Sequence, residues 1–182
     1  TLTEALRQQR RQSAKEAPPL PPGKYRILYA DPPWKYGDSR KALEGTTGAS
    51  AHYQSMSIAE LCALPIQELA GDNAVLFLWT TSPLLESCFP VIKAWGFQYK
   101  TSFVWDKVKH NMGHYNSVRH EFLLTCTRGS CMPDTPILYD SVQSIPRSDK
   151  HSEKPEEFRV IIETLYTHGS KIELFGRSRH PG

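Results

Sequence analysis

Four consecutive residues combine groups that could bind an aromatic amine: Asp31, Pro32, Pro33 and Trp34. The Asp31 carboxylate and the proline carbonyls are hydrogen-bond acceptors, and the Trp34 indole offers a flat apolar face. This set suits a planar ring with an exocyclic amine, because the acceptors would take its N–H groups. The indole would stack on the ring, an interaction worth about 1–3 kcal/mol per base. The alternative is that the prolines form only a rigid turn and that Trp34 is a core residue.

The segment before this tetrad, KYRILYA from Lys24 to Ala30, must position it. Its alternation of Tyr25, Ile27 and Tyr29 with other residues, rich in β-branched and aromatic types, predicts a mostly buried strand. Two prolines cannot continue a sheet ladder, so the strand must end at Asp31. Ligands of open α/β sheets bind just past the carboxyl ends of strands. The tetrad is therefore predicted to lie at a binding edge.

Strand and helix patterns alternate along the rest of the chain. Further strands are expected at Ala74–Thr80, Gln98–Lys107, Glu121–Arg128, Val142–Arg147 and Lys171–Gly176. Helices are expected to begin at the Ser57–Glu60 capping box, at Ser82 as N-cap before Pro83, and at Lys154-Pro155. This alternation predicts an α/β fold with one doubly wound, mostly parallel sheet.

The composition indicates an ordinary globular domain. The chain has 182 residues, of which 39% are hydrophobic and 23% charged, enough for a sizeable core. No apolar run approaches the roughly 20 residues needed to cross a bilayer, and we see no signal-peptide core. We therefore expect a cytoplasmic protein without a membrane partner. The net charge of +3 permits a polyanionic partner but does not require one.

Four cysteines without a CxxC pair sit among apolar residues: Cys62, Cys88, Cys126 and Cys131. They are typical of reduced core thiols. Three histidines could join the last two cysteines in a zinc site: His110, His114 and His120. Their spacing matches no common zinc pattern, so we expect no metal.

Two segments are basic enough to contact nucleic acid. Residues 1–23 read as a basic helix and a proline-rich connector, and we expect the α/β domain to cover 24–182. The helix could clamp phosphates or simply be solvated. Between the strands expected at 98–107 and 121–128, basic residues surround Tyr115, namely Lys107, Lys109, His114 and Arg119. This mixture suits contacts with a single nucleic-acid strand, although a solvated hairpin would look the same.

The tetrad and several later motifs together resemble the MT-A70 family of S-adenosylmethionine-dependent adenine-N6 methyltransferases. The later motifs are HYQSMS with Tyr53, LFLWTT at 76–81, WGF at 95–97, EKPEE at 153–157 and KIELFGR at 171–177. The family includes the catalytic subunit of the eukaryotic mRNA adenosine methyltransferase and bacterial and phage relatives. The resemblance implies a Rossmann-like methyltransferase fold with a permuted motif order, in which the tetrad precedes the cofactor strand.

The resemblance also implies a site for S-adenosylmethionine. Lys154 matches a family lysine that can pair with the methionine carboxylate of the cofactor. Arg177 matches an arginine at the ribose, and His180 would line the same pocket. Near the end of the last expected strand, Glu173 and Gly176 would also contact the cofactor, and the absent side chain of Gly176 would let the cofactor approach the backbone.

On the substrate side, Tyr53 would pack near the target base and Glu121 near the bound nucleoside. Glu121 opens an apolar strand, so its carboxylate would need a partner. Asp31 would face both ligands and, with the Pro32 carbonyl, would accept the N6–H groups of adenine. The expected reaction is methyl transfer from S-adenosylmethionine to adenine N6, with DNA favoured. RNA adenosine, cytosine N4 and a non-catalytic binding subunit remain alternatives, and a homodimer or heterodimer is left open.

Overall fold

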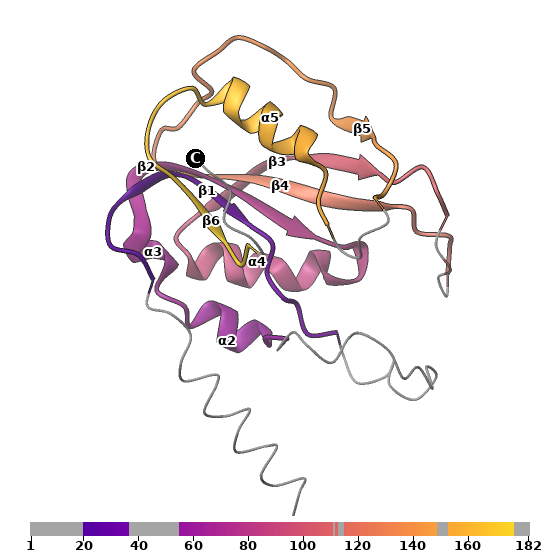
Figure 1. Cartoon of the computed structure of the whole chain (residues 1–182). Coiled ribbons are helices and arrows are strands. Elements are labelled where there is room, and N and C mark those ends of the chain that lie inside the picture. The colour runs from indigo at the N-terminus through magenta and orange to yellow at the C-terminus, as the bar shows by residue number, and fades with distance from the viewer. Residues whose placement is uncertain (1–19, 37–54, 111, 113–114, 149–152, 177–182) are drawn as a thin grey trace, which may run out of the picture.

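The structure is a computed structural model that describes residues 20–36, 55–110, 112, 115–148 and 153–176. Its six strands are β1 (Tyr25–Ala30), β2 (Ala70–Thr80), β3 (Gln98–Asp106), β4 (His120–Arg128), β5 (Val142–Ser144) and β6 (Lys171–Leu174). Its helices are α2 (Ile58–Cys62), α3 (Ile66–Leu69), α4 (Leu85–Ala94) and α5 (Glu156–Leu165), with a 3₁₀ turn η3 at Ser82–Leu84. The strands form one sheet with helices on both faces (Figure 1).

The strand order across the sheet is β5-β3-β4-β2-β1-β6. Three of the five pairings, β1 with β2, β1 with β6 and β3 with β5, are parallel. Strand β4 runs antiparallel to both β2 and β3, because a hairpin connection rather than a helical crossover joins β3 to β4. The predicted α/β fold with a mostly parallel sheet is confirmed. The beginning of β4 consequently lies at the same edge as the carboxyl ends of β1 and β2.

Strand β1 is buried on both faces, which explains its continuous run of apolar residues. Ile27 and Tyr29 pack in one cluster with Phe158 of α5. Leu28 and Ala30 point to the opposite face and pack in a second cluster with Leu61 of α2. In Figure 1, α5 covers one side of the sheet, and α2 and α4 cover the other. Double burial of this kind is typical of a central parallel strand.

The local helix signals were right at one position and wrong at another. Ser57 forms the predicted capping box with Glu60 at the start of α2. Ser82 does not cap a helix, because it is the first residue of η3 and its hydroxyl lies 3.0 Å from Nε2 of His120.

The predicted N-terminal helix lies outside the described residues, and the domain division at residues 23 and 24 stays a prediction. Among the described helices, none has the length and apolar character required to span a membrane.

Candidate active site

The tetrad follows β1 in a turn that is hydrogen-bonded to the backbone of Met56. The Met56 N–H donates to the Pro33 carbonyl at 2.8 Å, and the Lys35 N–H donates to the Met56 carbonyl at 2.9 Å. The Trp34 N–H donates to the Pro32 carbonyl at 2.8 Å. These bonds fix the direction in which Asp31 leaves the sheet. The Pro32 carbonyl keeps a second lone pair for another donor.

A cavity of about 470 Å³ opens beside the tetrad. Its walls come from the ends of several elements: Asp31, Pro32, Pro33, Trp34, Tyr36, Ser55, Trp79, Thr80, Thr81, Glu121, Lys154, Phe175 and Gly176. Ligand cavities in proteins typically measure roughly 300–1,000 Å³. The cavity therefore has an ordinary ligand-site size and lies where the carboxyl-end rule places it.

Lys154 lies between two carboxylates in this cavity. Its Nζ is 3.3 Å from Oδ1 of Asp31 and 2.9 Å from Oε2 of Glu121. The ammonium also lies 5.3 Å from the ring centre of Trp79. Burial opposes its charged form, but the carboxylates of Asp31 and Glu121 outweigh burial and raise the pKa of Lys154. Lys154 is therefore a fixed, buried cation.

Glu121 is held from both sides. Its second oxygen, Oε1, forms an ion pair with Lys107, whose side chain is only 12% exposed. Burial alone would raise the pKa of Glu121, but the ammonium groups of Lys154 and Lys107 lower it. The predicted need for a partner is confirmed. Asp31, Lys154, Glu121 and Lys107 form a network of alternating charges, which we call the ion network.

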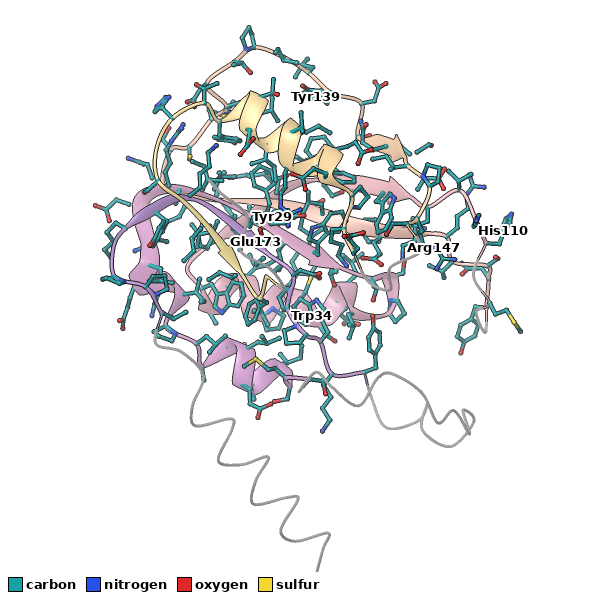
Figure 2. The ribbon with its side chains drawn as sticks, in the orientation of Figure 1. Tyr29, Trp34, His110, Tyr139, Arg147 and Glu173 are labelled. Carbon is teal, nitrogen blue, oxygen red and sulfur yellow. The ribbon has the colours of Figure 1, made fainter. Side chains whose placement is uncertain are left out.

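Trp34 is more buried than a stacking platform should be. Its side chain belongs to the core cluster, the residue is 8% exposed, and its Nε1 donates to the Trp79 carbonyl at 2.9 Å. Figure 2 shows it on the side of the sheet that carries α2 and α4. The structure thus places Trp34 in the core, which was the alternative left open by the sequence, and the indole N–H is used by the end of β2. Trp34 still lines the cavity, and stacking on a base stays a prediction.

Comparison with known proteins decides the family. The family model MT-A70 matches residues 25–182. The chain belongs to the MT-A70 family. It is therefore a methyltransferase with a Rossmann-like fold, as the resemblance implied.

Three relatives illustrate the breadth of this similarity. The chain is 34% identical over 182 residues to Type II methyltransferase M.MunI of a Mycoplasma species, covering 91% of this chain and 77% of that protein. It is 30% identical over 164 residues to an N(6)-adenosine-methyltransferase MT-A70-like protein of Drosophila melanogaster, covering 85% and 25%. It is 29% identical over 164 residues to the human N(6)-adenosine-methyltransferase catalytic subunit METTL3, covering 85% and 26%. The chain thus spans about a quarter of the length of the two animal relatives.

At the end of the MT-A70 motif KIELFGR, the structure separates two predicted cofactor residues. Gly176 lines the cavity. Glu173 is not one of the lining residues, because its carboxylate pairs with Arg159 of α5 at 2.7 Å. A Cβ on Gly176 would meet Oε1 of Glu173 at 3.1 Å. The absent side chain of this glycine thus leaves room for Glu173, which Figure 2 shows near Tyr29.

Two described residues of the β3–β4 connection that were predicted to bind substrate, Lys109 and Arg119, do not line the cavity. Lys109 is exposed, and Arg119, whose side chain is 44% exposed, pairs with Asp106 at 3.0 Å. Figure 2 shows His110 at the outer end of this connection. Lys107 differs from the prediction, because it is buried in the ion network instead of lying on the surface. Four predicted residues fall outside the described part of the chain: Tyr53, His114, Arg177 and His180.

Several lining residues were missed at the sequence level. Thr80 and Thr81 come at the carboxyl end of β2, directly after its apolar residues, just as Asp31 comes after β1. The tendency of ligands to bind at the carboxyl ends of strands would have identified both threonines. Tyr36 also lines the cavity, and its hydroxyl lies 3.0 Å from the Thr81 hydroxyl. No pattern in the sequence signals that second contact. Within the described residues, no group of three His, Cys, Asp or Glu side chains could hold a metal ion.

Proposed function

We propose that the chain transfers a methyl group from S-adenosylmethionine to the N6 amine of adenine in DNA. The observation that carries this proposal is the placement of Asp31 beside the buried Lys154 ammonium, both in the wall of one cavity. The Asp31 side chain remains 28% exposed, so its carboxylate can meet a ligand. The named activities of the MT-A70 relatives support the same chemistry.

The adenine N6 lone pair is delocalised into the ring, so N6 is a weak nucleophile. Asp31 would accept one N6–H, and the Pro32 carbonyl would accept the other with its second lone pair. These bonds would concentrate the lone pair on N6 and orient it. Orientation of this kind can lower a barrier by roughly 7–11 kcal/mol, and charge placed for the transition state adds to it.

The residues present fit S-adenosylmethionine, which supplies an electrophilic methyl group on its sulfonium when bound. Its amino acid end carries a carboxylate and an ammonium. Lys154 can bind the carboxylate and Asp31 the ammonium, since both side chains line the cavity. Lys154 already contacts two carboxylates, so a ligand carboxylate must share this cation with them. The cofactor pocket would be completed by Phe175 and Gly176.

Features outside the cavity support a nucleic acid partner and a reducing compartment. Tyr115 is 103% exposed, and Lys109 is exposed on the same connection. An exposed aromatic ring and an exposed cation on one connection suit stacking and phosphate contact with a single strand. The four cysteines are free thiols, which fits a cytoplasmic location. Light scattering of the purified chain with and without DNA would show whether it forms a homodimer, and a heterodimer would require a different partner chain.

The direct test is to identify the methylated nucleoside. The purified chain is incubated with deuterium-labelled S-adenosylmethionine and either unmethylated genomic DNA or total RNA, and the digested nucleosides are analysed by mass spectrometry. Label on deoxyadenosine at N6 is the expected result. Label on adenosine would assign the activity to RNA, and adenosine is the nucleoside named for the METTL3 relative. Label on deoxycytidine, or cofactor binding with no label on any nucleoside, would overturn the proposal.

A further inference from the structure

Lys107 is built into the protein interior next to the cavity, although it is not one of the residues that line it. It follows the last residue of β3, and its N–H donates to the Arg119 carbonyl at 2.8 Å. Its ammonium pairs with Oε1 of Glu121 and lies 5.0 Å from the ring centre of Trp105. A lysine with these contacts is poorly placed to bind a phosphate on the surface.

Each of the two lysines of the ion network lies over the ring of a tryptophan. Lys107 lies over Trp105, and Lys154 lies over Trp79. The two indoles touch edge to face with their centres 6.0 Å apart. Aromatic faces attract cations at such distances. The two rings are almost perpendicular, with 76° between their planes, so each ammonium lies over a ring face of its own. Glu121 pairs with both ammonium groups.

We propose that Lys107 is a positioning residue that acts through Glu121 to keep the charge of Lys154 available to a carboxylate ligand. This inference rests on the proposed function, because it assumes that Lys154 binds the cofactor carboxylate. Each oxygen of Glu121 contacts a different lysine, Oε1 contacting Lys107 and Oε2 contacting Lys154. Lys107 therefore balances the Glu121 charge from the side opposite the cavity.

The charge balance explains why a second lysine is needed. Two ammonium groups and two carboxylates make the ion network neutral. Without Lys107, the four-residue ion network would be reduced to one ammonium, Lys154, and two carboxylates, so the network would carry one net negative charge. A third carboxylate, from the ligand, would then be repelled. The effect is strong because Glu121 is buried and shielded from solvent.

Among the described residues, further ionisable side chains lie at the adjoining strand ends, namely Asp106, Arg119 and His120. Asp106 pairs with Arg119 at 3.0 Å, and His120 lies 3.0 Å from the Ser82 hydroxyl. Since these groups have partners of their own, Lys107 and Lys154 are the cations that act on Glu121.

The experiment measures S-adenosylmethionine binding by calorimetry without nucleic acid, for Lys107→Met, Lys107→Arg and the double variant Lys107→Met/Glu121→Gln. Lys107→Met should raise the dissociation constant roughly tenfold, as expected for losing one charged contact. Lys107→Arg should restore most of the affinity. The double variant should also recover, because the neutral amide removes the uncompensated charge. Lys100→Met, an exposed lysine of β3 that bonds Gln98, is the matched control.

Two results would overturn the inference. One is a double variant that binds as weakly as Lys107→Met, since a packing role would not be rescued by a change of charge. The other is unchanged cofactor affinity together with weaker DNA binding and a salt slope reduced by about one, which would make Lys107 a phosphate contact.

A ligand-free readout separates this inference from the proposed function. Glu121 stabilises the fold at pH values above its unfolded pKa, and this contribution is lost as the pH falls through its lowered folded pKa. Lys107→Met should raise that folded pKa and move the acid loss of thermal stability to higher pH. If the wild type binds no S-adenosylmethionine but this shift occurs, the proposed function fails while the coupling stands. An unchanged pH profile would refute the coupling itself.

Discussion

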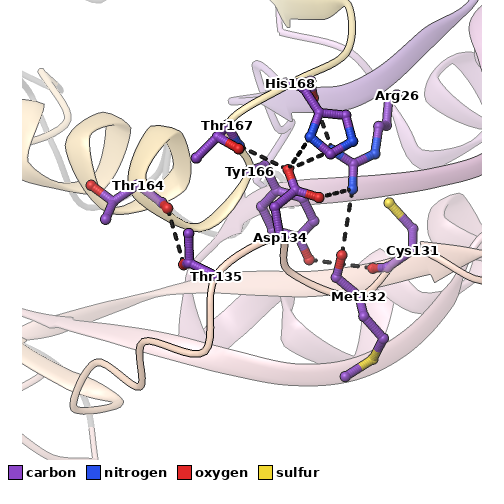
Figure 3. Close-up of polar contacts among 9 residues, drawn as sticks. All are labelled: Arg26, Cys131, Met132, Asp134, Thr135, Thr164, Tyr166, Thr167 and His168. Carbon is purple, nitrogen blue, oxygen red and sulfur yellow. Dashed lines mark hydrogen bonds and ion pairs between the residues drawn. The ribbon is translucent and has the colours of Figure 1, made fainter.

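The two ends of strand β1 carry ion clusters that look alike and do different things. Arg26 lies near the beginning of β1, and Asp31 follows its end. Arg26 forms a bidentate pair with Asp134, at 2.6 Å and 2.8 Å. Asp134 also accepts the Thr167 N–H at 2.8 Å and lies 3.1 Å from Nδ1 of His168. Figure 3 shows this cluster joining three segments that are far apart in sequence.

The Arg26 cluster is closed by the protein itself. The guanidinium donates to the His168 carbonyl at 2.8 Å and lies 5.4 Å from the ring centre of Tyr166. Gly169 has a φ of +93°, and a Cβ there would meet Cδ of Arg26 at 2.7 Å. The backbone thus passes too close to Arg26 for any other residue. The contacts of this cluster hold two segments against β1, the α5–β6 connection and the segment around Asp134.

At the other end of β1, the same types of charge face a cavity of about 470 Å³. Perturbed ionisation does not distinguish the two ends, because the pKa values of both Asp134 and Glu121 lie below their ordinary values. The end at Asp31 is distinguished by its cavity, because Asp31, Glu121 and Lys154 all line it. The comparison teaches that paired charges mark a functional site only where they border space for a ligand at the carboxyl ends of strands.

The sharpest way to break this comparison is Asp31→Asn. If the cavity end is catalytic, losing the carboxylate should reduce methyl transfer about a hundredfold to a thousandfold, with the melting temperature nearly retained. The measurement is methylated nucleoside formed per minute by mass spectrometry. Asp72→Asn, an exposed aspartate of β2, should leave turnover unchanged. Full activity of Asp31→Asn would remove the proposed mechanism.

Lys154→Met should have the next largest effect. It removes the cation that Asp31 and Glu121 share. Both carboxylates would lose their ion pair with Lys154, and the cofactor carboxylate would lose its binding partner. We expect the S-adenosylmethionine dissociation constant to rise roughly tenfold to a hundredfold, measured by calorimetry. Exposed Lys93 of α4 provides the control variant Lys93→Met. Unchanged affinity would show that the cofactor binds elsewhere.

Arg26→Met tests the opposite end of β1. The side chain is 21% exposed, so the pair is partly screened and its loss should lower the melting temperature by roughly 5 °C. Turnover per folded molecule should stay unchanged. Hydrogen bonds from Arg26 hold the pKa of Asp134 well below its ordinary value. The stabilisation from this pair is present above the unfolded pKa of Asp134 and is lost as the pH falls through the folded pKa. On acidification, the variant should therefore begin to unfold at a higher pH than the wild type. A large loss of turnover in this variant would refute the structural role.

The sequence could predict much of the fold because its signals were local. Residues 25–30 are apolar or aromatic except for Arg26, as expected for a mostly buried strand, and Ser57 with Glu60 forms a capping box. The prolines after Asp31 placed the tetrad at the end of its strand. Ser82 failed as a cap because His120, which occupies its hydroxyl, is 38 residues away in sequence. Local patterns cannot report such a contact.

The site was harder to predict because its chemistry depends on pairs that are distant in sequence. Lys107 sits in a basic segment and looked like a surface residue, yet Glu121 and Trp105 bury it. Glu173 fits the motif of a cofactor strand, but Arg159 of α5 takes its carboxylate. Residue type and spacing identified Asp31 and Lys154, since both belong to motifs with a defined order. The partner of each charge could be read only from the assembled sheet.

Trp34 tests the comparison most finely, because it belongs to both the core and the cavity wall. Trp34→Phe keeps an aromatic ring but leaves the Trp79 carbonyl without the indole N–H. We expect a loss of roughly 1 kcal/mol in the free energy of unfolding, measured by denaturant titration. If Trp34 also stacks on the target base, the KM for nucleic acid should rise more than the cofactor dissociation constant. A loss of stability with an unchanged KM for nucleic acid and an unchanged cofactor dissociation constant would show that Trp34 has only a structural role, as Arg26 does. Because the indole is only 8% exposed, a stacking role would require Trp34 to present its small exposed part to the base.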